Sequence, residues 1–294
     1  MKRYAFVGAV QFSARCLDAL LGSGANVVGI LCPSESKFNA DFADLGPVAA
    51  KHGHEVRRFT KIADEAEHLR SLRPDVVFVL GLSQILPPEV LKIPTLGCIG
   101  SHPALLPRNR GRHPLIWAIA NGLPESGLSL LWLDEGVDSG DLWKQRSFPI
   151  GPDDDAGAVY ERVCGLGAEM LREGVAELER GVISRAPQDS SRANYWRKRS
   201  AKDGEIDWRM SSRRAYDLVR ALRPPYGGAH CLQGGKEVKI WRARPVDAPD
   251  SRHYEPGRVL RTTPALTVKC GEGALEILES GIDAGTLKEG DYLA

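Results

Sequence analysis

The sequence predicts an α/β protein with a doubly wound, mostly parallel sheet, followed by a smaller domain rich in short strands. In the first half, apolar runs alternate with helical patterns, as in βαβ units. Between Ile183 and Ser200 this pattern gives way to a stretch with Pro187 and several serines and arginines, and short alternating segments follow it. Because 294 residues are long for one core, we expect a catalytic domain at 1–185, a linker at 186–202 and a C-terminal domain at 203–294.

The first domain is predicted to open with strands and helices in the order of a parallel sheet. The expected elements are the strand Tyr4–Gly8, the helix Ser13–Leu21, the strand Val27–Leu31, the helix Leu45–His52, the strand Glu55–Phe59, the helix Ala63–Leu72 and the strand Val76–Leu80. The turn from Gly8 to Ser13 has one glycine where a dinucleotide-binding loop needs three. The layout is therefore Rossmann-like, but an NAD enzyme is disfavoured.

Further along the first domain, a helix is expected from Leu115 to Ala120, because Pro114 suits the first helical position. A strand follows at Ser129–Leu133, and a long helix at Ala156–Arg180. The run Asp153-Asp154-Asp155 comes directly before that helix. Acidic residues stabilise the amino end of a helix, so we interpret the run as a cap and not as a metal site.

The C-terminal domain is predicted to hold one helix and a sheet of short strands. The helix runs from Ser211 to Leu222 and is ended by Pro224-Pro225. The expected strands are Val238–Trp241, Arg258–Leu260, Leu266–Lys269 and Leu275–Leu278. Evenly spaced short strands with glycine-rich turns favour a small barrel or an open sheet.

The composition is that of an ordinary soluble protein. Lys+Arg 39 against Asp+Glu 38 gives a net charge of +1, less bias than a dedicated nucleic-acid binder shows. The six cysteines include no C-x-x-C pair, which favours neutral thiols in a reducing compartment. No run reaches the roughly 18 apolar residues of a membrane-spanning helix, and the amino terminus carries no leader-type cleavage site. We therefore expect a cytoplasmic protein without a membrane partner.

The chemistry is predicted to lie in the stretch Gly97–Trp117, which is crowded with Pro, Gly and Arg. It places His102 at a strand end, and ligands of α/β sheets bind at the carboxyl ends of strands. Asp138, in the run Val137-Asp138-Ser139-Gly140-Asp141, is a candidate acidic partner. A His paired with an Asp is the minimal set of groups for moving a proton near neutral pH.

Several motifs in this order resemble the N10-formyltetrahydrofolate-dependent formyltransferases, a family that includes methionyl-tRNA formyltransferase and the sugar N-formyltransferases. They are Gly8…Phe12-Ser13, His102-x-x-Leu105-Leu106-Pro107-x-x-Arg110-Gly111, Asp138-Ser139-Gly140-Asp141, Asp203-Gly204-x-Ile206-Asp207-Trp208, Val238-Lys239-Ile240-Trp241 and Pro256-Gly257-x-Val259-Leu260. The resemblance implies a Rossmann-like formyltransferase domain and a C-terminal domain similar to an OB fold. It also implies an enzyme that takes N10-formyltetrahydrofolate as co-substrate and needs no metal.

The resemblance further implies a catalytic set written Asn-x-His plus Asp. His102 and Asp138 match the last two positions, whereas Gly100 stands at the Asn position. By the same resemblance the folate site comprises Phe78, Leu82, Gln84, Ile85, Leu86, Asp134, Gly136, Val137 and Asp138. The residues expected to contact the amine substrate or anionic groups are Phe12, Ser13, Ser101, Asn109, Arg110 and Arg112.

Gly100 removes a side-chain N–H that would support the oxyanion of the tetrahedral intermediate, a loss that can cost on the order of 10²–10³ in rate. Three explanations stay open. A water fills the space of the missing amide, Ser101 or Asn109 reaches in, or the protein binds substrates with little turnover. We favour the water, which predicts that Gly100→Asn retains or raises activity whereas His102→Ala abolishes it.

The identity of the amine is the least determined point. The residues of the segments Lys37–Leu45 and Asn109–Pro114 resemble those of the sugar-modifying branch of the family. We therefore expect the formyl acceptor to be a primary amine on a nucleotide-linked amino sugar. The alternative is methionyl-tRNA, whose path Tyr195–Arg199 could line, although the same segment could be a solvated linker. A further alternative is an inactive folate- or nucleotide-binding homologue. The oligomeric state is open, with a homodimer as one option.

Overall fold

The computed structural model describes residues 1–35 and 40–294, so the first part of the predicted Lys37–Leu45 segment lies outside the described residues. The chain divides into two compact units. Unit 1 comprises residues 1–114, 126–148 and 160–196, and unit 2 comprises 115–125, 149–159 and 197–294. The predicted domain boundaries stay a prediction, but residues 186–196 belong with unit 1.

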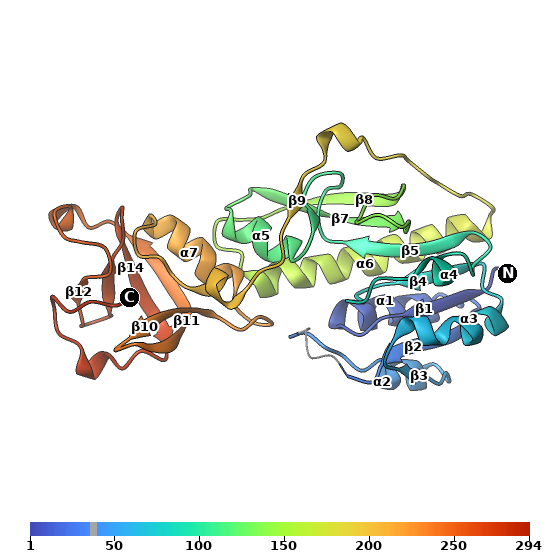
Figure 1. Ribbon diagram of the computed structural model, residues 1–294, viewed down its shortest axis with the longest axis horizontal. Coiled ribbons are helices and arrows are strands. Elements are labelled where there is room, and N and C mark those ends of the chain that lie inside the picture. Colours follow the sequence, from blue (N-terminus) through green and yellow to red (C-terminus); the bar gives the residue numbers. More distant parts are fainter. Residues whose placement is uncertain (36–39) are drawn as a thin grey trace. The chain divides into compact units, whose positions relative to one another are not determined.

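Unit 1 is built on a seven-stranded sheet with the order β3-β2-β1-β4-β5-β7-β8 (Figure 1). The strands are β1 (Tyr4–Val7), β2 (Val27–Pro33), β3 (Arg57–Phe59), β4 (Val76–Val79), β5 (Gly97–His102), β7 (Glu125–Trp132) and β8 (Leu142–Pro149). The first five are parallel, and β7 runs antiparallel to β5. The central strands β1 and β4 are apolar and fully buried, as expected of strands covered on both faces.

The helices of unit 1 cover both faces of this sheet. They are α1 (Gln11–Gly22), α2 (Gly46–Lys51), α3 (Ala66–Leu72), α4 (Pro88–Leu91) and most of α6 (Ala156–Glu179). Helix α6 is tied to the sheet and to α1 by two hydrogen bonds. The Tyr4 hydroxyl donates to Glu179 at 2.9 Å, and the Phe12 N–H donates to the Tyr160 hydroxyl at 3.1 Å.

Two different cores lie on the two faces of the sheet, because successive side chains of a strand point to opposite sides. One core packs Val7, Val77 and Val79 against α3 and α4, with Leu69 and Val90 at its centre. The other is a chain of aromatic rings: Tyr4 stacks on Phe78 at 5.6 Å, Phe78 lies 5.9 Å from Trp143, and Trp143 lies 6.4 Å from Trp132. Such ring pairs contribute about 0.5–1.5 kcal/mol each beyond area burial.

Strand β5 sits between β4 and β7 and carries the predicted catalytic residues. Gly100 is opposite Val79 on one side and Leu131 on the other, and His102 is opposite Ser129. Because alternate residues share a face, Gly100 and His102 lie on the same side as Cys98, which belongs to the α3/α4 core. The site therefore lies on that face, at the carboxyl end of β5.

Unit 2 contains a five-stranded antiparallel sheet with the order β10-β11-β14-β13-β12 (Figure 1). Its strands are β10 (Ala229–Gln233), β11 (Lys236–Val246), β12 (Val259–Arg261), β13 (Thr267–Lys269) and β14 (Ala274–Ser280). Helix α7 (Ser212–Ala221) packs on β11 and β14, and the unit also includes nearly all of α5 (Pro114–Ala120). The Asp155 carboxylate accepts a hydrogen bond from the Ala158 N–H at 2.9 Å, so the acidic run caps α6 as predicted.

The predicted fold class is confirmed in both parts, a mostly parallel sheet followed by a smaller antiparallel one. The sequence pattern missed β8, β10 and the two-residue strands β6 (Arg110–Gly111) and β9 (Tyr195–Trp196). In β8 only Trp143 and Phe148 are buried, and polar or charged residues fill the positions between them, so the apolar signal is weak. Among the described residues, no helix combines the length and apolarity that crossing a membrane requires.

Candidate active site

His102 is held by hydrogen-bonding groups at both ring nitrogens. Its side chain is buried, and Nε2 lies 2.7 Å from the backbone carbonyl oxygen of Asn109. Since a carbonyl only accepts, Nε2 carries a proton in this arrangement. Nδ1 lies 3.5 Å from Oδ2 of Asp138. The Nδ1 edge is therefore the part of the ring that can exchange a proton, and it faces the carboxylate.

Asp138 is brought to His102 by the loop that follows β7. Its Oδ2 also accepts a hydrogen bond from the Gly111 N–H at 2.9 Å, so one oxygen faces both the imidazole and the turn after β6. The structure thus brings together the two residues that sequence reasoning paired, 36 positions apart. A carboxylate in this place orients the imidazole and stabilises its positive charge when it takes a proton.

The backbone around this pair adopts left-handed conformations that non-glycine residues seldom take. Asn109 has φ 62°, His113 has φ 57° and Asp138 has φ 52°. Each such residue costs of order 1–3 kcal/mol and persists only where its surroundings enforce it, which is common at functional sites. These conformations lower the stability of the fold, and they hold the Asn109 and Asp138 loops on either side of the His102 ring.

The space over Gly100 is filled by the Leu133 side chain. A Cβ built on Gly100 would lie 2.5 Å from Leu133 Cδ2 and 3.0 Å from Cγ, far inside a normal carbon contact. A side chain at this position meets Leu133 at its first carbon, whereas the water expected in place of the missing amide stays a prediction. It follows that Gly100→Asn fits only if Leu133 moves.

The loops after β4 and β7 both reach the face that carries Gly100. Leu82 and Leu133 pack against the α3/α4 core, whereas Ile85 is 81% exposed and Val137 is 55% exposed. Apolar side chains left open to solvent, one of them next to Asp138 in sequence, suit the walls of a site for a flat heteroaromatic ligand. On this observation the loops fit the pterin part of a folate.

Several predicted site residues instead have structural contacts. Phe78 is fully buried between Tyr4 and Trp143, so its ring has no face for a ligand. Leu86 is buried in the α3/α4 core, and Gln84 is held by the backbone of Thr60 and Ile62. These three are left out of the site proposed below.

The predicted opening of the chain is also structural. Ser13 Oγ donates to the Leu80 carbonyl and accepts from the Ala9 and Val10 N–H groups, with the side chain fully buried. Phe12 is buried as well. Ser13 joins α1 to the end of β4 and Phe12 packs against α6, so neither presents a free group to an amine.

The loop residues predicted to bind substrate differ in accessibility. Arg112 is exposed, and Ser101 and Asn109 are half-buried. Arg110 is only 2% exposed, and its guanidinium donates to Gln188 Oε1 at 2.8 Å and to the Tyr195 hydroxyl at 3.0 Å. A buried guanidinium held in this way is a structural anchor and has no free face for a substrate phosphate.

In the β7–β8 loop, the Asp134 carboxylate accepts from the Gly136 N–H at 3.0 Å and from the Ser139 hydroxyl at 2.9 Å. Asp134 therefore shapes its own loop. Gly140 is needed there too, because a Cβ would lie 1.8 Å from the Trp132 carbonyl oxygen. Asp138 thus projects from a loop whose path is set by its neighbours.

Sequence reasoning missed three residues beside this pair: Leu133 over Gly100, Gln188 on the Asp138 loop, and Asn194 on the Asn109 turn. Leu133 lies in a predicted strand, where nothing in the pattern distinguishes it. Gln188 and Asn194 lie in the predicted linker, where polar residues are expected for solvation alone. No signal in a single sequence would have found them.

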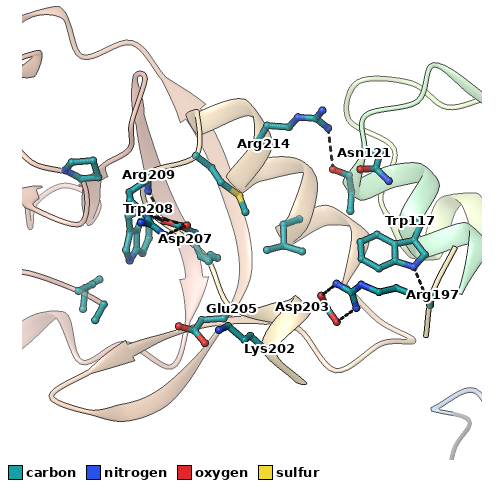
Figure 2. A pocket seen from close by; sticks show the side chains of 17 residues that line it. Trp117, Asn121, Arg197, Lys202, Asp203, Glu205, Asp207, Trp208, Arg209 and Arg214 are labelled. Carbon is teal, nitrogen blue, oxygen red and sulfur yellow. Dashed lines mark hydrogen bonds and ion pairs between the residues drawn. The ribbon is translucent and has the colours of Figure 1, made fainter. Parts of the chain in front are cut away.

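A large hollow lies within unit 2, with a volume of about 930 Å³, and its lining includes Trp117, Arg197 and Lys202 (Figure 2). None of the residues predicted for the active site lines it. Its four cationic side chains (Arg197, Lys202, Arg209, Arg214) face three carboxylates (Asp203, Glu205, Asp207), and Arg197 and Arg209 are already paired. With charges so nearly balanced, we assign the chemistry to the His102–Asp138 pair and not to the larger hollow.

A buried histidine with a half-buried aspartate beside it, at the carboxyl end of a strand in a Rossmann-like sheet, suits an enzyme that moves a proton during group transfer. The comparisons with known proteins are more specific. The formyl transferase model matches residues 2–175, and the model of the formyl transferase C-terminal domain matches residues 198–287. The chain belongs to the formyltransferase family, and the predicted enzyme class, an N10-formyltetrahydrofolate-dependent formyltransferase, is confirmed.

Relatives that align over nearly the whole chain share one printed name. Methionyl-tRNA formyltransferase of Caldanaerobacter subterraneus is 34% identical over 94% of this chain and 91% of its own length. That of Citrifermentans bemidjiense is 34% identical over 99% of this chain and 93% of its own length. The prediction of a nucleotide-linked amino sugar as acceptor is therefore wrong, and these relatives support the stated alternative. That prediction rested on two short sequence segments, which are too short to distinguish two branches of one family.

Solved structures of similar fold include both folate-bound and sugar-modifying proteins. HypX from Aquifex aeolicus in complex with tetrahydrofolic acid has a TM-score of 0.66 and 23% identity, over 95% of this chain and 44% of that one. The N-formyltransferase from Helicobacter canadensis has a TM-score of 0.73 and 17% identity, over 95% of this chain and all of that one. At such identities the similarity establishes the fold only.

Proposed function

We propose that this chain is a methionyl-tRNA formyltransferase, which moves the formyl group of N10-formyltetrahydrofolate to the amino group of methionine carried on a tRNA. The observation that supports this choice is the full-length similarity, at 34% identity, to enzymes with that activity. The similar sugar-modifying structures are 17–23% identical, which is too distant to favour their acceptors.

In the proposed reaction the amine nitrogen bonds to the formyl carbon, and the bond from that carbon to the folate nitrogen breaks. One proton leaves the amine, and one reaches the departing nitrogen. His102 is proposed to accept the amine proton at Nδ1, since Nε2 is engaged by the Asn109 carbonyl. Asp138, 3.5 Å away, is proposed to stabilise the imidazolium that results.

The formyl donor is proposed to lie between the loops at 82–87 and 133–140. Ile85 and Val137 supply exposed apolar surface there, and backbone amides and carbonyls of both loops would pair with the pterin edge. In this proposal the formyl carbon lies near the Nδ1 edge of His102. Because Gly100 has no side chain and Leu133 covers it, the oxyanion would be supported by other donors, for which Ser101 and Asn109 are the candidates that the sequence offers.

The test is a formyl-transfer assay with purified protein, N10-formyltetrahydrofolate and methionyl-tRNA, in which release of tetrahydrofolate is followed. We expect turnover with the tRNA and none with a nucleotide-linked amino sugar. The Michaelis constant for tRNA should rise steeply with salt, because binding of RNA releases counterions from several phosphates. Turnover with the amino sugar alone would contradict the proposal.

The roles of the two residues are tested by His102→Ala and Asp138→Asn. We expect each to lower kcat by on the order of 10²–10⁴, the usual contribution of a general acid–base group. His253→Ala is the matched control, since His253 is exposed in unit 2 and outside the proposed site. If His102→Ala kept the rate of the unmodified protein, the proposed mechanism would be wrong.

A further inference from the structure

We propose that residues 186–196, the first part of the predicted linker, form a strap that positions both halves of the catalytic pair. Gln188 holds the loop that carries Asp138, and Asn194 holds the turn that carries the carbonyl partner of His102. Both act as positioning residues, not as catalytic ones. The inference rests on the catalytic roles proposed for His102 and Asp138.

Gln188 joins the strap to the Asp138 loop by two hydrogen bonds. Its side-chain Nε2 donates to the Asp138 carbonyl at 2.9 Å and to the Gly140 carbonyl at 2.7 Å. Both contacts are to backbone oxygens, so the Asp138 carboxylate keeps its own contacts with His102 and Gly111. The amide therefore fixes where the loop lies without taking part in the chemistry of the carboxylate.

The orientation of the Gln188 amide is set by Arg110. Arg110 donates to Gln188 Oε1 through Nη2 at 2.8 Å and through Nε at 3.3 Å. A guanidinium has only donors, so the amide oxygen must face it and the NH₂ group must face the two carbonyls. Arg110 is 2% exposed, and its third contact is the hydroxyl of Tyr195, which belongs to the same strap. The network is thus anchored on a buried guanidinium, which connects half-buried Gln188 with exposed Tyr195.

Asn194 joins the strap to the His102 side of the pair. Its Oδ1 accepts from the Asn109 N–H at 2.9 Å, and its Nδ2 donates to Asn109 Oδ1 at 3.1 Å. These two hydrogen bonds hold Asn109 in its left-handed conformation at φ 62°. In that conformation the Asn109 carbonyl lies 2.7 Å from His102 Nε2.

Backbone pairing fastens the strap to the same turn. Strand β9 runs parallel to β6, with Arg110 opposite Tyr195 and Gly111 opposite Trp196. Gly111 has φ 102°, and a Cβ there would lie 2.3 Å from the Trp196 carbonyl oxygen, so only glycine allows this approach. The Gly111 N–H is also the donor to Asp138 Oδ2. The short pairing of β6 with β9 therefore fixes the positions of the strap, the Asn109 turn and the Asp138 carboxylate relative to one another.

The proposal predicts the effect of two isosteric changes. Gln188→Glu keeps an acceptor for Arg110 but removes both donors to the Asp138 loop. Asn194→Asp keeps the acceptor for the Asn109 N–H but sets two oxygens against each other in place of the second bond. Because misplacement of a reacting group by about 1 Å can cost up to about 10²-fold in rate, we expect kcat to fall about 10- to 100-fold in each variant. The Michaelis constant for methionyl-tRNA should stay within about threefold, since neither residue is proposed to contact the tRNA.

Two matched controls carry the same chemical change elsewhere. Gln233→Glu alters a glutamine that also bridges a loop, through the Asp283 carbonyl, but in unit 2. Asn26→Asp alters an asparagine outside the site, in the turn before β2. Both should retain the kcat of the unmodified protein. Equal loss of kcat in the controls would overturn the proposal, because the effect would then be one of charge or stability.

Two measurements that do not depend on turnover test whether the strap positions the catalytic pair, separately from the proposed function. Hydrogen exchange at the Gly111 amide, which is bonded to Asp138 Oδ2, should quicken in Gln188→Glu. The ¹⁵N resonance of His102 Nε2 should shift in Asn194→Asp as its bond to Asn109 weakens. Unchanged exchange and an unchanged resonance would refute the strap even if kcat fell. If the unmodified protein did not formylate methionyl-tRNA, the proposed function would fail while these two measurements still decided on the strap.

Discussion

The packing of Leu133 over Gly100 gives a stability prediction that can be worked from the structure. In Gly100→Ala the new Cβ would lie 2.5 Å and 3.0 Å from two carbons of Leu133, where normal contacts are about 3.5–4.0 Å. Overpacking of this kind costs about 1–3 kcal/mol. Replacing glycine also lowers the conformational entropy of the unfolded chain, which stabilises the folded protein by about 0.4–1 kcal/mol. We therefore expect Gly100→Ala to lower the free energy of unfolding by about 1–2 kcal/mol.

The cause is isolated by repeating the change in a Leu133→Ala background. Leu133→Ala removes the three atoms that lie nearest to the added Cβ, so Gly100→Ala should then be neutral or stabilising by up to about 1 kcal/mol. The difference between the two backgrounds is the coupling energy of a double-mutant cycle, expected at about 1–3 kcal/mol. The same reasoning predicts that Gly100→Asn alone does not raise activity, contrary to expectation from the sequence.

The assay is urea unfolding of the four proteins, with unit 1 followed separately because two units need not unfold as one. Cys98 lies buried on β5 and becomes reactive only when this strand opens, so pulse labelling of its thiol with detection by mass reports on the right unit. With Leu133 in place, the steric reasoning would be refuted if Gly100→Ala had the same free energy of unfolding as the unmodified protein. Equal effects in both backgrounds would refute it as well.

Two further predictions concern ionisable groups. A hydrogen bond from Arg197 holds the pKa of Asp203 below its ordinary value, so the stability from this group is present above about pH 4 and is lost as the pH falls through the folded-state pKa. Asp203→Asn should lower the unfolding free energy of unit 2 at pH 6, and the difference should shrink below about pH 4; a constant difference would contradict this. Burial raises the pKa of the Cys98 and Cys164 thiols to about 12, so native protein at pH 7.5 should react slowly with a maleimide and all six cysteines should react after denaturation. Fast labelling of the native protein would refute this.

Most of the fold was predictable because its signals are local. The apolar runs at Tyr4–Val7 and Val76–Val79 are strands buried on both faces, which need no partner to be recognised. The helix α7 carries its own cap, since Ser211 accepts from the Arg214 N–H. The edge strand β8 was missed because polar and charged residues separate its two buried aromatic side chains, and β10 was missed because its five residues are too few to show a pattern.

The candidate site was predictable only where residue type and order carry meaning. His102 and Asp138 could be paired from the sequence because a histidine after an apolar strand and an aspartate in a glycine-rich loop are the groups that proton transfer needs. The sequence also has Gly100 where the family resemblance implies a catalytic amide, and this assignment stays a prediction. It could not say which acceptor is used, because short motifs are shared between branches of the family.

By itself, then, the sequence determined the fold class, the His–Asp pair and the missing amide at Gly100. Only the tertiary structure decided that Leu133 fills the space over Gly100 and that Phe78 is core. It alone brought Gln188 and Asn194 onto the two sides of the pair, 50 and 85 residues from their partners. The physical reason is that packing and amide hydrogen bonds depend on distance in space, and no local pattern records which distant chains will meet.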